Sequence, residues 1–379
     1  MRDKAKITML SASLGLSGTP RVMMDIIENI NHDRFDVSVA YKPEYPGFES
    51  DLLVPLRSMG IKLVPLRGRK LFALTGIIDL YEYLKHNSIQ IVHCWDALSI
   101  IARILKPCTR CRIVESFGNP VTSRGSLIYY LTNKITSLLM DGFIYTINEV
   151  QKSFENSGVL FLKGKENAVI ANCINTGKLN PSYDVKAIKE QWHIPEDHIV
   201  LTNVALFNGQ KAQVYLLQAM RIILEKIPKA KLILVGWGPL ENELKVRARD
   251  LGIENDVLFT GKREHEEVFR LLSITDIFVL SSLWEGFCLA IAEAMAMGKP
   301  VVSTRTDGSQ TLIIDNETGL LVPQKDPGAL AYAITSLIND PETMRLMGAR
   351  ARQRINALFT PEKFIHAYEA FYHKIVNRE

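Results

Sequence analysis

The chain has 379 residues, of which 47% are hydrophobic and 23% are charged, and its net charge is +4. This composition is typical of a globular protein with room for two ordinary α/β domains. The mild positive charge excludes the strongly basic surface that nucleic-acid-binding proteins carry, so no nucleic-acid partner is expected.

The chain also lacks the marks of a membrane-spanning or disulfide-bonded protein. No run of 18 uninterrupted apolar residues occurs, so no spanning helix is expected. The five cysteines are sparse and odd in number, which favours a reducing compartment. Cys108 and Cys111 form a lone CxxC pair with no second pair at zinc-ribbon spacing, so a metal site there is disfavoured. These features predict a cytoplasmic protein.

Short apolar strand patterns alternate with helical patterns through the first part of the chain. Strands are predicted at residues 6–12, 35–40, 61–65, 89–93, 111–115 and 143–147, with a helix at about 20–30. Strands that alternate with helices predict a parallel, doubly wound sheet.

A second series of the same kind begins near residue 199. Strands are predicted at residues 199–205, 230–235, 256–260, 276–280 and 300–304, and helices at about 211–226, 239–251, 264–273, 288–297 and 326–338. The polar stretch 175–183 separates the two series. We therefore expect one α/β domain over residues 1–174 and a second over 175–360, with a final helix in 361–379 that packs back on the first.

The most informative motif contains two glutamates, Glu285 and Glu293, with seven residues between them. Gly286 has no Cβ, so the backbone beside Glu285 can approach a ligand closely. The helix that follows presents free N–H groups and a partial positive charge at its N-terminus, which suits a phosphate. The flanking carboxylates can accept hydrogen bonds from hydroxyl groups. Together these groups predict a binding site for a nucleotide sugar.

The small residues of the same helix offer a second interpretation. A helix such as Ala290 to Ala296 is often simply buried, with its glutamate facing solvent, and the spacing alone favours this alternative. The neighbourhood favours the ligand site. Strands at 276–282 and 301–304 make the stretch a βαβ unit, and its loop lies at the carboxyl end of a strand, where open α/β sheets bind ligands.

Four stretches together, residues 232–241, 259–263, 284–302 and 318–323, resemble the glycosyltransferases of family 4, which have the GT-B fold. The resemblance implies two Rossmann-like domains facing across a cleft, the first on the acceptor side and the second on the donor side. It also implies a retaining hexosyltransferase. Such an enzyme moves a sugar from a nucleotide-diphosphate sugar to a glycan or lipid-linked acceptor, in cell-surface polysaccharide or glycolipid synthesis.

The resemblance implies roles for the residues that match the family's motifs. Glu285 and Lys211 are the catalytic candidates: the glutamate would contact hydroxyls of the donor sugar, and the lysine would neutralise the leaving phosphate. The donor-binding candidates are Glu293 for the ribose diol, Gly286, Phe287, Cys288 and Leu289 for the diphosphate, and Gly236, Gly238, Gly18 and Arg263 around the nucleotide. The acceptor-side candidates are His93, Asp96 and Asn119.

Three of the side chains near the predicted sites have an ordinary alternative. His93 ends a predicted strand, where a hydrogen-bonded structural role is as good an interpretation as acceptor contact. Arg263 could bind the nucleotide or be merely solvated. Trp237 could wall the base pocket, and a packed aromatic is the simpler interpretation.

Several positions differ from the family's pattern. Leu206 stands where the family usually has an arginine, and Gly118 stands where it commonly has a histidine. Ser17 and Pro20 replace a glycine and a glutamate in the first loop, and Thr311 replaces a later glutamate. The departing phosphate oxygen could itself take the acceptor proton, so the missing histidine is compatible with transfer. The differences leave open a degenerate GT-B protein that binds a nucleotide sugar without transfer, as a partner or regulatory subunit.

The sequence predicts no metal and no cofactor beyond the nucleotide-sugar co-substrate, because no Asp-x-Asp occurs. A nicotinamide dehydrogenase is disfavoured, since Gly15 and Gly18 lack the GxGxxG spacing and Glu241 stands where the other glycine loop needs its third glycine. A sugar-nucleotide epimerase of the same fold stays an alternative.

Two segments, residues 67–78 and 124–134, mix basic and apolar side chains. Such segments can seat on an anionic membrane surface, and amphipathic helices that cover the sheet are the alternative. Residues 1–170 carry 21 Lys and Arg against 16 Asp and Glu, which is compatible with anionic lipid or a phosphorylated acceptor. We expect peripheral contact of the first domain with the inner face of a membrane, serving a lipid-linked acceptor.

Overall fold

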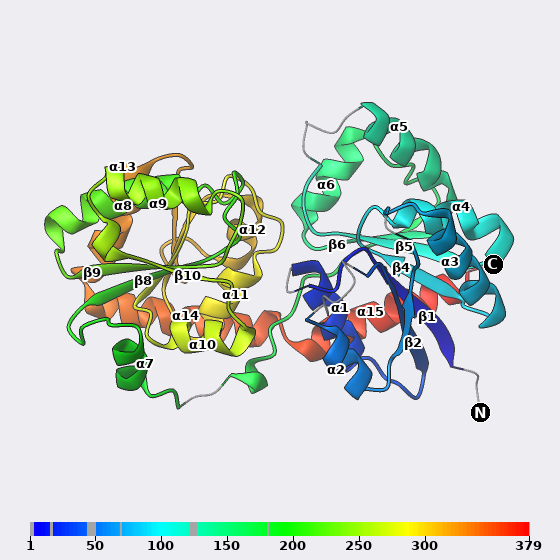
Figure 1. Ribbon diagram of the computed structural model, residues 1–379, viewed down its shortest axis with the longest axis horizontal. Coiled ribbons are helices and arrows are strands. Elements are labelled where there is room, and N and C mark those ends of the chain that lie inside the picture. The colour runs from blue at the N-terminus through cyan, green and yellow to red at the C-terminus, as the bar shows by residue number, and fades with distance from the viewer. Residues whose placement is uncertain are drawn as a thin grey trace. The chain divides into compact units, whose positions relative to one another are not determined.

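The computed structural model describes residues 4–15, 18–43, 51–68, 70–121, 127–179 and 182–378. The chain divides into two compact units. The first unit comprises Met1–Cys173 with Pro361–Glu379, and the second comprises Ile174–Thr360 (Figure 1). The boundary expected from the sequence falls after residue 174, one residue beyond the end of the first unit at Cys173.

The first unit contains a parallel sheet whose described strands run in the order β3-β2-β1-β4-β5-β6-β7. The strands are β1 Ala5–Ser11, β2 Phe35–Tyr41, β3 Lys62–Pro65, β4 Ile91–Cys94, β5 Arg112–Phe117, β6 Gly142–Tyr145 and β7 Glu166–Val169. The helices are α1 Gly18–Asn29, α2 Leu53–Ser58, α3 Leu74–His86, α4 Ser99–Thr109, α5 Leu127–Thr136, η1 Ser137–Leu139, α6 Asn148–Ser157 and α15 Pro361–Val376. The order reverses between β1 and β4, which makes the sheet doubly wound.

The second unit repeats this plan with the described strand order β10-β9-β8-β11-β12-β13. Its strands are β8 Ile199–Val204, β9 Ala230–Val235, β10 Val257–Gly261, β11 Ile277–Leu280, β12 Val301–Thr304 and β13 Leu320–Val322. Its helices are η2 Thr176–Lys178, α7 Val185–Gln191, α8 Gln213–Lys226, α9 Glu241–Asp250, η3 Glu254–Asp256, α10 His265–Ser273, α11 Leu289–Ala296, α12 Asp307–Leu312, α13 Pro327–Ile338 and α14 Pro341–Leu358. In Figure 1, α8, α9 and α13 cover one face of this sheet, and α10, α11 and α14 cover the other. The predicted fold class, two doubly wound α/β domains, is confirmed.

Buried strands explain why the sequence patterns were easy to recognise. All four residues of β4, β6, β11 and β12 are buried. A parallel sheet covered by helices on both faces needs near-continuous apolar strands, and these segments supply them.

The last helix, α15, completes the core of the first unit. It buries Phe364, Tyr368, Phe371, Tyr372 and Ile375 at helical spacing. It contacts α1, β4 and β7. Residues 361–376 therefore pack with the amino-terminal sheet although about two hundred residues separate them in sequence.

Candidate active site

The site in the second unit forms where the strand order reverses, between β8 and β11. The connections from these two strands run in opposite directions along the sheet, and open α/β sheets characteristically bind ligands at such a point. Lys211 lies in the loop after β8, and Glu285 lies in the loop after β11. The Nζ atom of Lys211 is 2.6 Å from Oε1 of Glu285. The two catalytic candidates therefore form an ion pair at the switch point.

Protein groups hydrogen-bond to one of the two carboxylate oxygens of Glu285. Glu285 is buried, with 4% of its surface exposed. Its Oε1 accepts hydrogen bonds from Lys211 and from the Ser282 hydroxyl, the latter at 2.6 Å. Within the described part of the chain, Oε2 accepts no hydrogen bond from a protein group. This oxygen is thus oriented and still able to accept a bond from a ligand hydroxyl.

Backbone and side-chain hydrogen bonds tie the two loops together. The Leu283 amide donates to the Gln210 carbonyl at 2.8 Å, and the Gln210 side chain donates to the Trp284 carbonyl at 2.8 Å. The Ser281 hydroxyl donates to the Lys211 carbonyl at 2.9 Å. These bonds fix the backbone of both loops, so the ion pair is preorganised.

Glycine is required where the start of α12 packs against this site. The Gly308 amide donates to the Glu285 carbonyl at 3.1 Å. A Cβ on Gly308 would lie 1.7 Å from the carbonyl oxygen of Gly286. Any side chain at residue 308 would displace the loop that carries Glu285.

The charges of the site follow from its burial. Burial lowers the pKa of the Lys211 ammonium, but the neighbouring Cys288 and Glu285 raise it by more, so its pKa lies above the ordinary value. Burial, together with the charge of Glu285, raises the pKa of the Cys288 thiol to about 12. At neutral pH the lysine is therefore a cation, and the cysteine is a neutral, unreactive thiol.

The N-terminus of α11 adjoins this pair. Cys288 is its N-cap residue and makes no side-chain capping hydrogen bond. Phe287, 8% exposed, packs edge-on against Phe359 with ring centroids 5.4 Å apart and anchors the turn. The first N–H groups of a helix have no partner inside the helix and carry partial positive charge, so this end of α11 suits an anion.

Glu293, the second glutamate of the motif, lies on helix α11. It is buried, with 7% of its surface exposed, so the alternative in which it faces solvent is wrong. Its Oε1 lies 2.8 Å from Nε2 of His265, the first residue of α10. No sequence pattern points to this histidine, because its contact depends on how α10 and α11 pack.

Two glycines after β9 let its loop contact the loop after β8. Gly236 has φ 144°, and a Cβ there would lie 1.9 Å from the Ala205 carbonyl oxygen. A Cβ on Gly238 would lie 2.4 Å from the Phe207 carbonyl oxygen. Trp237 stands between them with 54% of its surface exposed, so the prediction of a packed aromatic is wrong.

Arg263 and Leu206 lie on neighbouring parts of the second unit. Arg263 donates to the Thr260 carbonyl at 2.6 Å, and its guanidinium lies 4.9 Å from the ring centre of Trp192. It is therefore held by protein groups rather than merely solvated. Leu206 is 41% exposed in the loop after β8, so an apolar side chain is displayed where the family pattern has a cation.

In the first unit, His93 has a structural role. It is fully buried, its Nδ1 pairs with the Tyr372 hydroxyl at 2.7 Å, and its Nε2 pairs with the Ser116 hydroxyl at 2.8 Å. Its ring stacks on Trp95 with centroids 3.9 Å apart. Burial lowers the pKa of His93 to about 3, so the ring is neutral. Since both ring nitrogens are occupied, the structural alternative replaces the predicted acceptor contact.

The other candidates of the first unit lie at or near the carboxyl edge of its sheet. Asp96, after β4, accepts hydrogen bonds from the Ala12 amide at 2.5 Å and the Leu98 amide at 2.9 Å, and burial raises its pKa. It thereby fixes the loop after β1 at the switch point of this sheet. Asn119 is exposed after β5, and Gly18 is the exposed first residue of α1. Ser17 lies outside the described residues.

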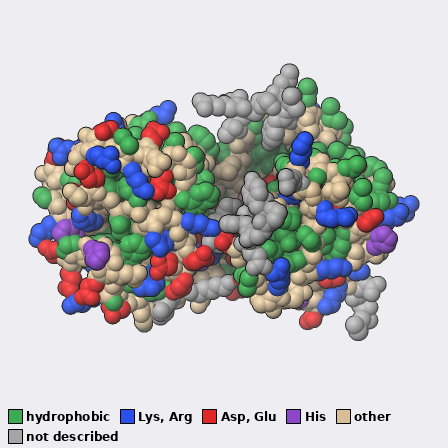
Figure 2. Space-filling model, viewed as in Figure 1, with side chains coloured by type: hydrophobic (Ala, Val, Ile, Leu, Met, Phe, Trp, Pro, Cys, Tyr) green, Lys and Arg blue, Asp and Glu red, His purple; other side chains and the backbone are tan. Residues whose placement is uncertain are grey.

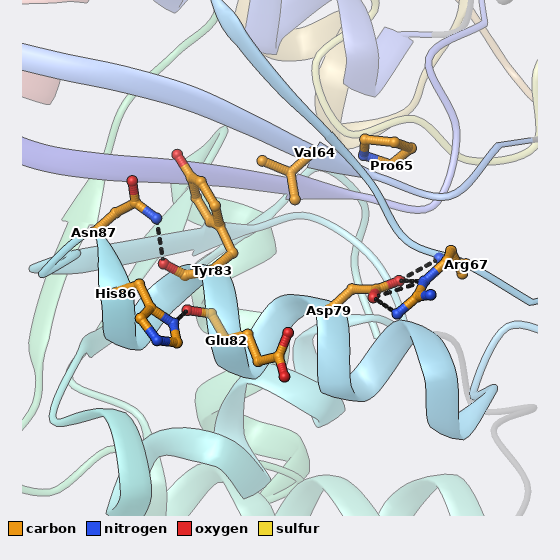
Figure 3. A pocket seen from close by; sticks show the side chains of 8 residues that line it. All are labelled: Val64, Pro65, Arg67, Asp79, Glu82, Tyr83, His86 and Asn87. Atoms are coloured by element: carbon orange, nitrogen blue, oxygen red, sulfur yellow. Dashed lines mark hydrogen bonds and ion pairs between the residues drawn. The ribbon is translucent and has the colours of Figure 1, made fainter.

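One pocket lies away from these candidates. It has a volume of about 430 Å³ and lies between strand β3 and helix α3 (Figure 3). Its lining includes Arg67 and Asp79, whose side chains form an ion pair at 2.6 Å. None of the predicted site residues lines this pocket.

Comparison with known proteins gives a family match in the second unit and structural neighbours for the whole chain. Residues 184–354, which include the Lys211–Glu285 pair, match the model of the family Glycosyl transferases group 1. This match covers most of the second unit. The chain is 28% identical over 312 residues to the putative glycosyltransferase EpsD of Bacillus subtilis, covering 79% of each chain. It is 26% identical over 371 residues to an Escherichia coli UDP-Gal:alpha-D-GlcNAc-diphosphoundecaprenol alpha-1,3-galactosyltransferase, covering 93% of this chain and 92% of that one.

The structure of the chain also has solved neighbours. That of Anabaena Alr3699/HepE in complex with UDP and glucose superposes with a TM-score of 0.83 and 18% identity, covering 98% of this chain and all of that one. At this identity the likeness shows the fold, which is GT-B. None of the helices in the described part of the chain is both long and apolar enough to span a bilayer.

Proposed function

We propose that this chain is a family 4 glycosyltransferase that transfers a hexose from a nucleotide-diphosphate sugar to a glycan or lipid-linked acceptor, with retention of anomeric configuration and without a metal. The observation that carries the proposal is the buried Lys211–Glu285 ion pair, 2.6 Å long, beside the uncapped N-terminus of α11. This arrangement provides a cation and helix N–H groups for a diphosphate, and a carboxylate oxygen for a sugar hydroxyl.

The chemistry follows from these charges. As the bond between the anomeric carbon and the phosphate oxygen breaks, negative charge grows on the diphosphate. The Lys211 ammonium and the N–H groups of α11 stabilise that charge. The departing phosphate oxygen takes the proton of the acceptor hydroxyl, whose oxygen bonds to the anomeric carbon on the same face. The free oxygen of Glu285 holds a sugar hydroxyl and fixes the ring during the exchange.

A UDP-hexose and a lipid-linked acceptor are the specific substrates we propose. The name of the Escherichia coli relative gives UDP-Gal as its donor and a diphosphoundecaprenol as its acceptor. The Anabaena neighbour was solved with UDP and glucose. With 26% and 18% identity, these proteins indicate which substrates to test first.

Turnover of a panel of nucleotide sugars in the presence of a chelator tests the proposal. We expect transfer to undecaprenyl-diphosphate-linked acceptor sugars without added metal, with a product anomer of the same configuration as the donor. Activity that is lost on chelation and restored by Mn²⁺ would refute the metal-free mechanism. Conversion of the donor sugar in the absence of acceptor would instead indicate an epimerase.

A second candidate function is binding without transfer. The exposed Leu206, at a position where the family pattern has an arginine, favours it, because one of two expected cations is missing. Gly118, exposed after β5, also lacks the side chain that the pattern has there. Tight nucleotide binding with neither sugar transfer nor slow hydrolysis of the donor would favour this role. Slow hydrolysis of the donor would favour an enzyme.

We also propose that one face of the first unit rests on an anionic membrane. The face is formed by α3, α4, α5 and η1, whose neighbouring members contact one another. Its exposed apolar side chains are Leu74, Ile78, Ile104, Tyr130, Leu131, Ile135 and Leu138. No Asp or Glu occurs in α4, α5 or η1; Lys134 on α5 supplies positive charge, whereas the ammonium of Lys106 on α4 is paired with Asp141 at 2.6 Å. Figure 2 shows hydrophobic side chains at the surface around α5. Apolar side chains with nearby cations suit the headgroup region.

Sedimentation with lipid vesicles checks this surface. The protein is expected to co-sediment with vesicles that contain phosphatidylglycerol at low salt, and Ile104→Glu with Ile135→Glu should abolish the effect. Tyr332→Glu is the matched control, because Tyr332 is 74% exposed but lies in the second unit. Failure of the wild-type protein to sediment, or equal losses in the control, would contradict the membrane face.

A further inference from the structure

His265 is tied to Glu293 in a way that the donor-site assignments do not explain. The Nε2 atom of His265 lies 2.8 Å from Oε1 of Glu293. A carboxylate only accepts hydrogen bonds, so Nε2 carries the proton and donates it. One turn along α10, Phe269 packs edge-on against the imidazole, with ring centroids 4.2 Å apart. Phe269 is 3% exposed, so its own position is fixed by the core and it holds the ring in one orientation.

The bond leaves the other oxygen of Glu293 oriented and unoccupied by protein. Among the residues that the structure describes, His265 is the hydrogen-bond partner of Glu293, and it uses Oε1. Glu293 as a whole is 7% exposed, and its Oε2 keeps contact with solvent, on the side from which a ligand can approach. A ligand hydroxyl that donates to this charged oxygen makes a charge-assisted hydrogen bond in place of its water.

We propose that His265 is a positioning residue that aims the free oxygen of Glu293 at the ribose, so that the pair selects ribonucleotides over 2′-deoxyribonucleotides. The inference rests on the proposed function, in which Glu293 holds the ribose diol. The imidazole prevents the carboxylate from rotating, and this keeps Oε2 where a ribose hydroxyl can reach it. A nucleotide that lacks the hydroxyl cannot make this bond, and a site built to hydrogen-bond a substrate hydroxyl rejects the analogue that lacks it.

The test compares ribonucleotides with deoxyribonucleotides by calorimetry. UDP, GDP and ADP are titrated into the wild-type protein, and the tightest binder is then compared with its 2′-deoxy form. We expect the wild type to prefer the ribonucleotide. His265→Phe should weaken ribonucleotide binding about tenfold and leave deoxyribonucleotide binding nearly unchanged, since it removes one hydrogen bond to a charged group. His265→Gln should restore most of the preference, because its side-chain amide can donate to Glu293.

Controls separate positioning from folding. His86→Phe removes an exposed histidine from α3 in the first unit and should leave both affinities unchanged. Thermal unfolding is recorded for every variant, and His265→Gln keeps the test decisive if His265→Phe does not fold.

Three results would overturn the inference. Equal losses for the ribonucleotide and its deoxy form, in His265→Phe and His265→Gln alike, would mean that His265 only supports the fold. Unchanged affinity for both would mean that it has no role in the site. Failure of the wild type to bind any of the three nucleotides would refute the proposed donor site itself, and this outcome differs from the first two because it precedes any substitution.

Discussion

Glu285→Gln is expected to lower kcat for sugar transfer at least about 100-fold, the usual scale for removing one preorganised electrostatic group from an active site. The substitution keeps the size of the side chain and an oxygen for the Ser282 hydroxyl, so the loop after β11 should keep its conformation. It removes the negative charge that makes Oε2 a strong acceptor for a donor hydroxyl. Initial rates with the donor that turns over fastest give the measurement.

The matched control for this variant is Glu342→Gln. Glu342 lies on α14, and 65% of its side chain is exposed in an ion pair with Arg345. Surface pairs of this kind contribute little to stability, so transfer by Glu342→Gln should equal that of the wild type. Normal turnover by Glu285→Gln would show that the assignment of the donor site to this loop is wrong.

Lys211→Met is expected to abolish transfer and also to destabilise the second unit. The substitution leaves the buried Glu285 carboxylate without its cation, and breaking a buried ion pair from one side costs about 3–5 kcal/mol. Met has a similar length and packs without a charge. Denaturant unfolding of the variant, followed by a signal from the second unit, should therefore show a lower free energy of unfolding than the wild type.

The double variant Lys211→Met with Glu285→Gln separates stability from activity. Because neither charge is then left unpaired, most of the lost free energy of unfolding should return, while transfer stays abolished. The difference between the double variant and the sum of the single variants measures the coupling of the pair. If the single lysine variant unfolds at the same denaturant concentration as the wild type, the ion pair is not the buried contact described above.

The elements that the sequence predicts well are those with a strong apolar period. The strands of both sheets are clear except β7 and β13, which were not predicted. β7 lies at the edge of its sheet with its residues half-buried or exposed, and β13 has only three residues, so neither gives a long apolar run. The helix α14 was also absent from the predictions, because its exposed face is rich in arginine and its apolar stripe is thin.

The sequence predicts which loops carry the site residues, but it does not predict the contacts between their side chains. Chain order and strand pattern place Lys211 and Glu285 after strands of one parallel sheet, so their meeting at one edge follows from topology. Their pairing through Oε1 depends on side-chain rotamers, and the contact of His265 with Glu293 depends on the packing of two helices. Neither contact can be inferred from the spacing of the residues in the sequence. His93 and Trp237 show the same limit, since burial of the first and exposure of the second are decided by tertiary packing.

A structure of the protein crystallised with UDP would show where the nucleotide binds. We expect the diphosphate at the N-terminus of α11, within hydrogen-bond distance of the Lys211 ammonium, with the ribose hydroxyls on Glu293. UDP bound elsewhere, for example in the pocket between β3 and α3, or a diphosphate with no contact to Lys211 or to α11, would contradict this expectation.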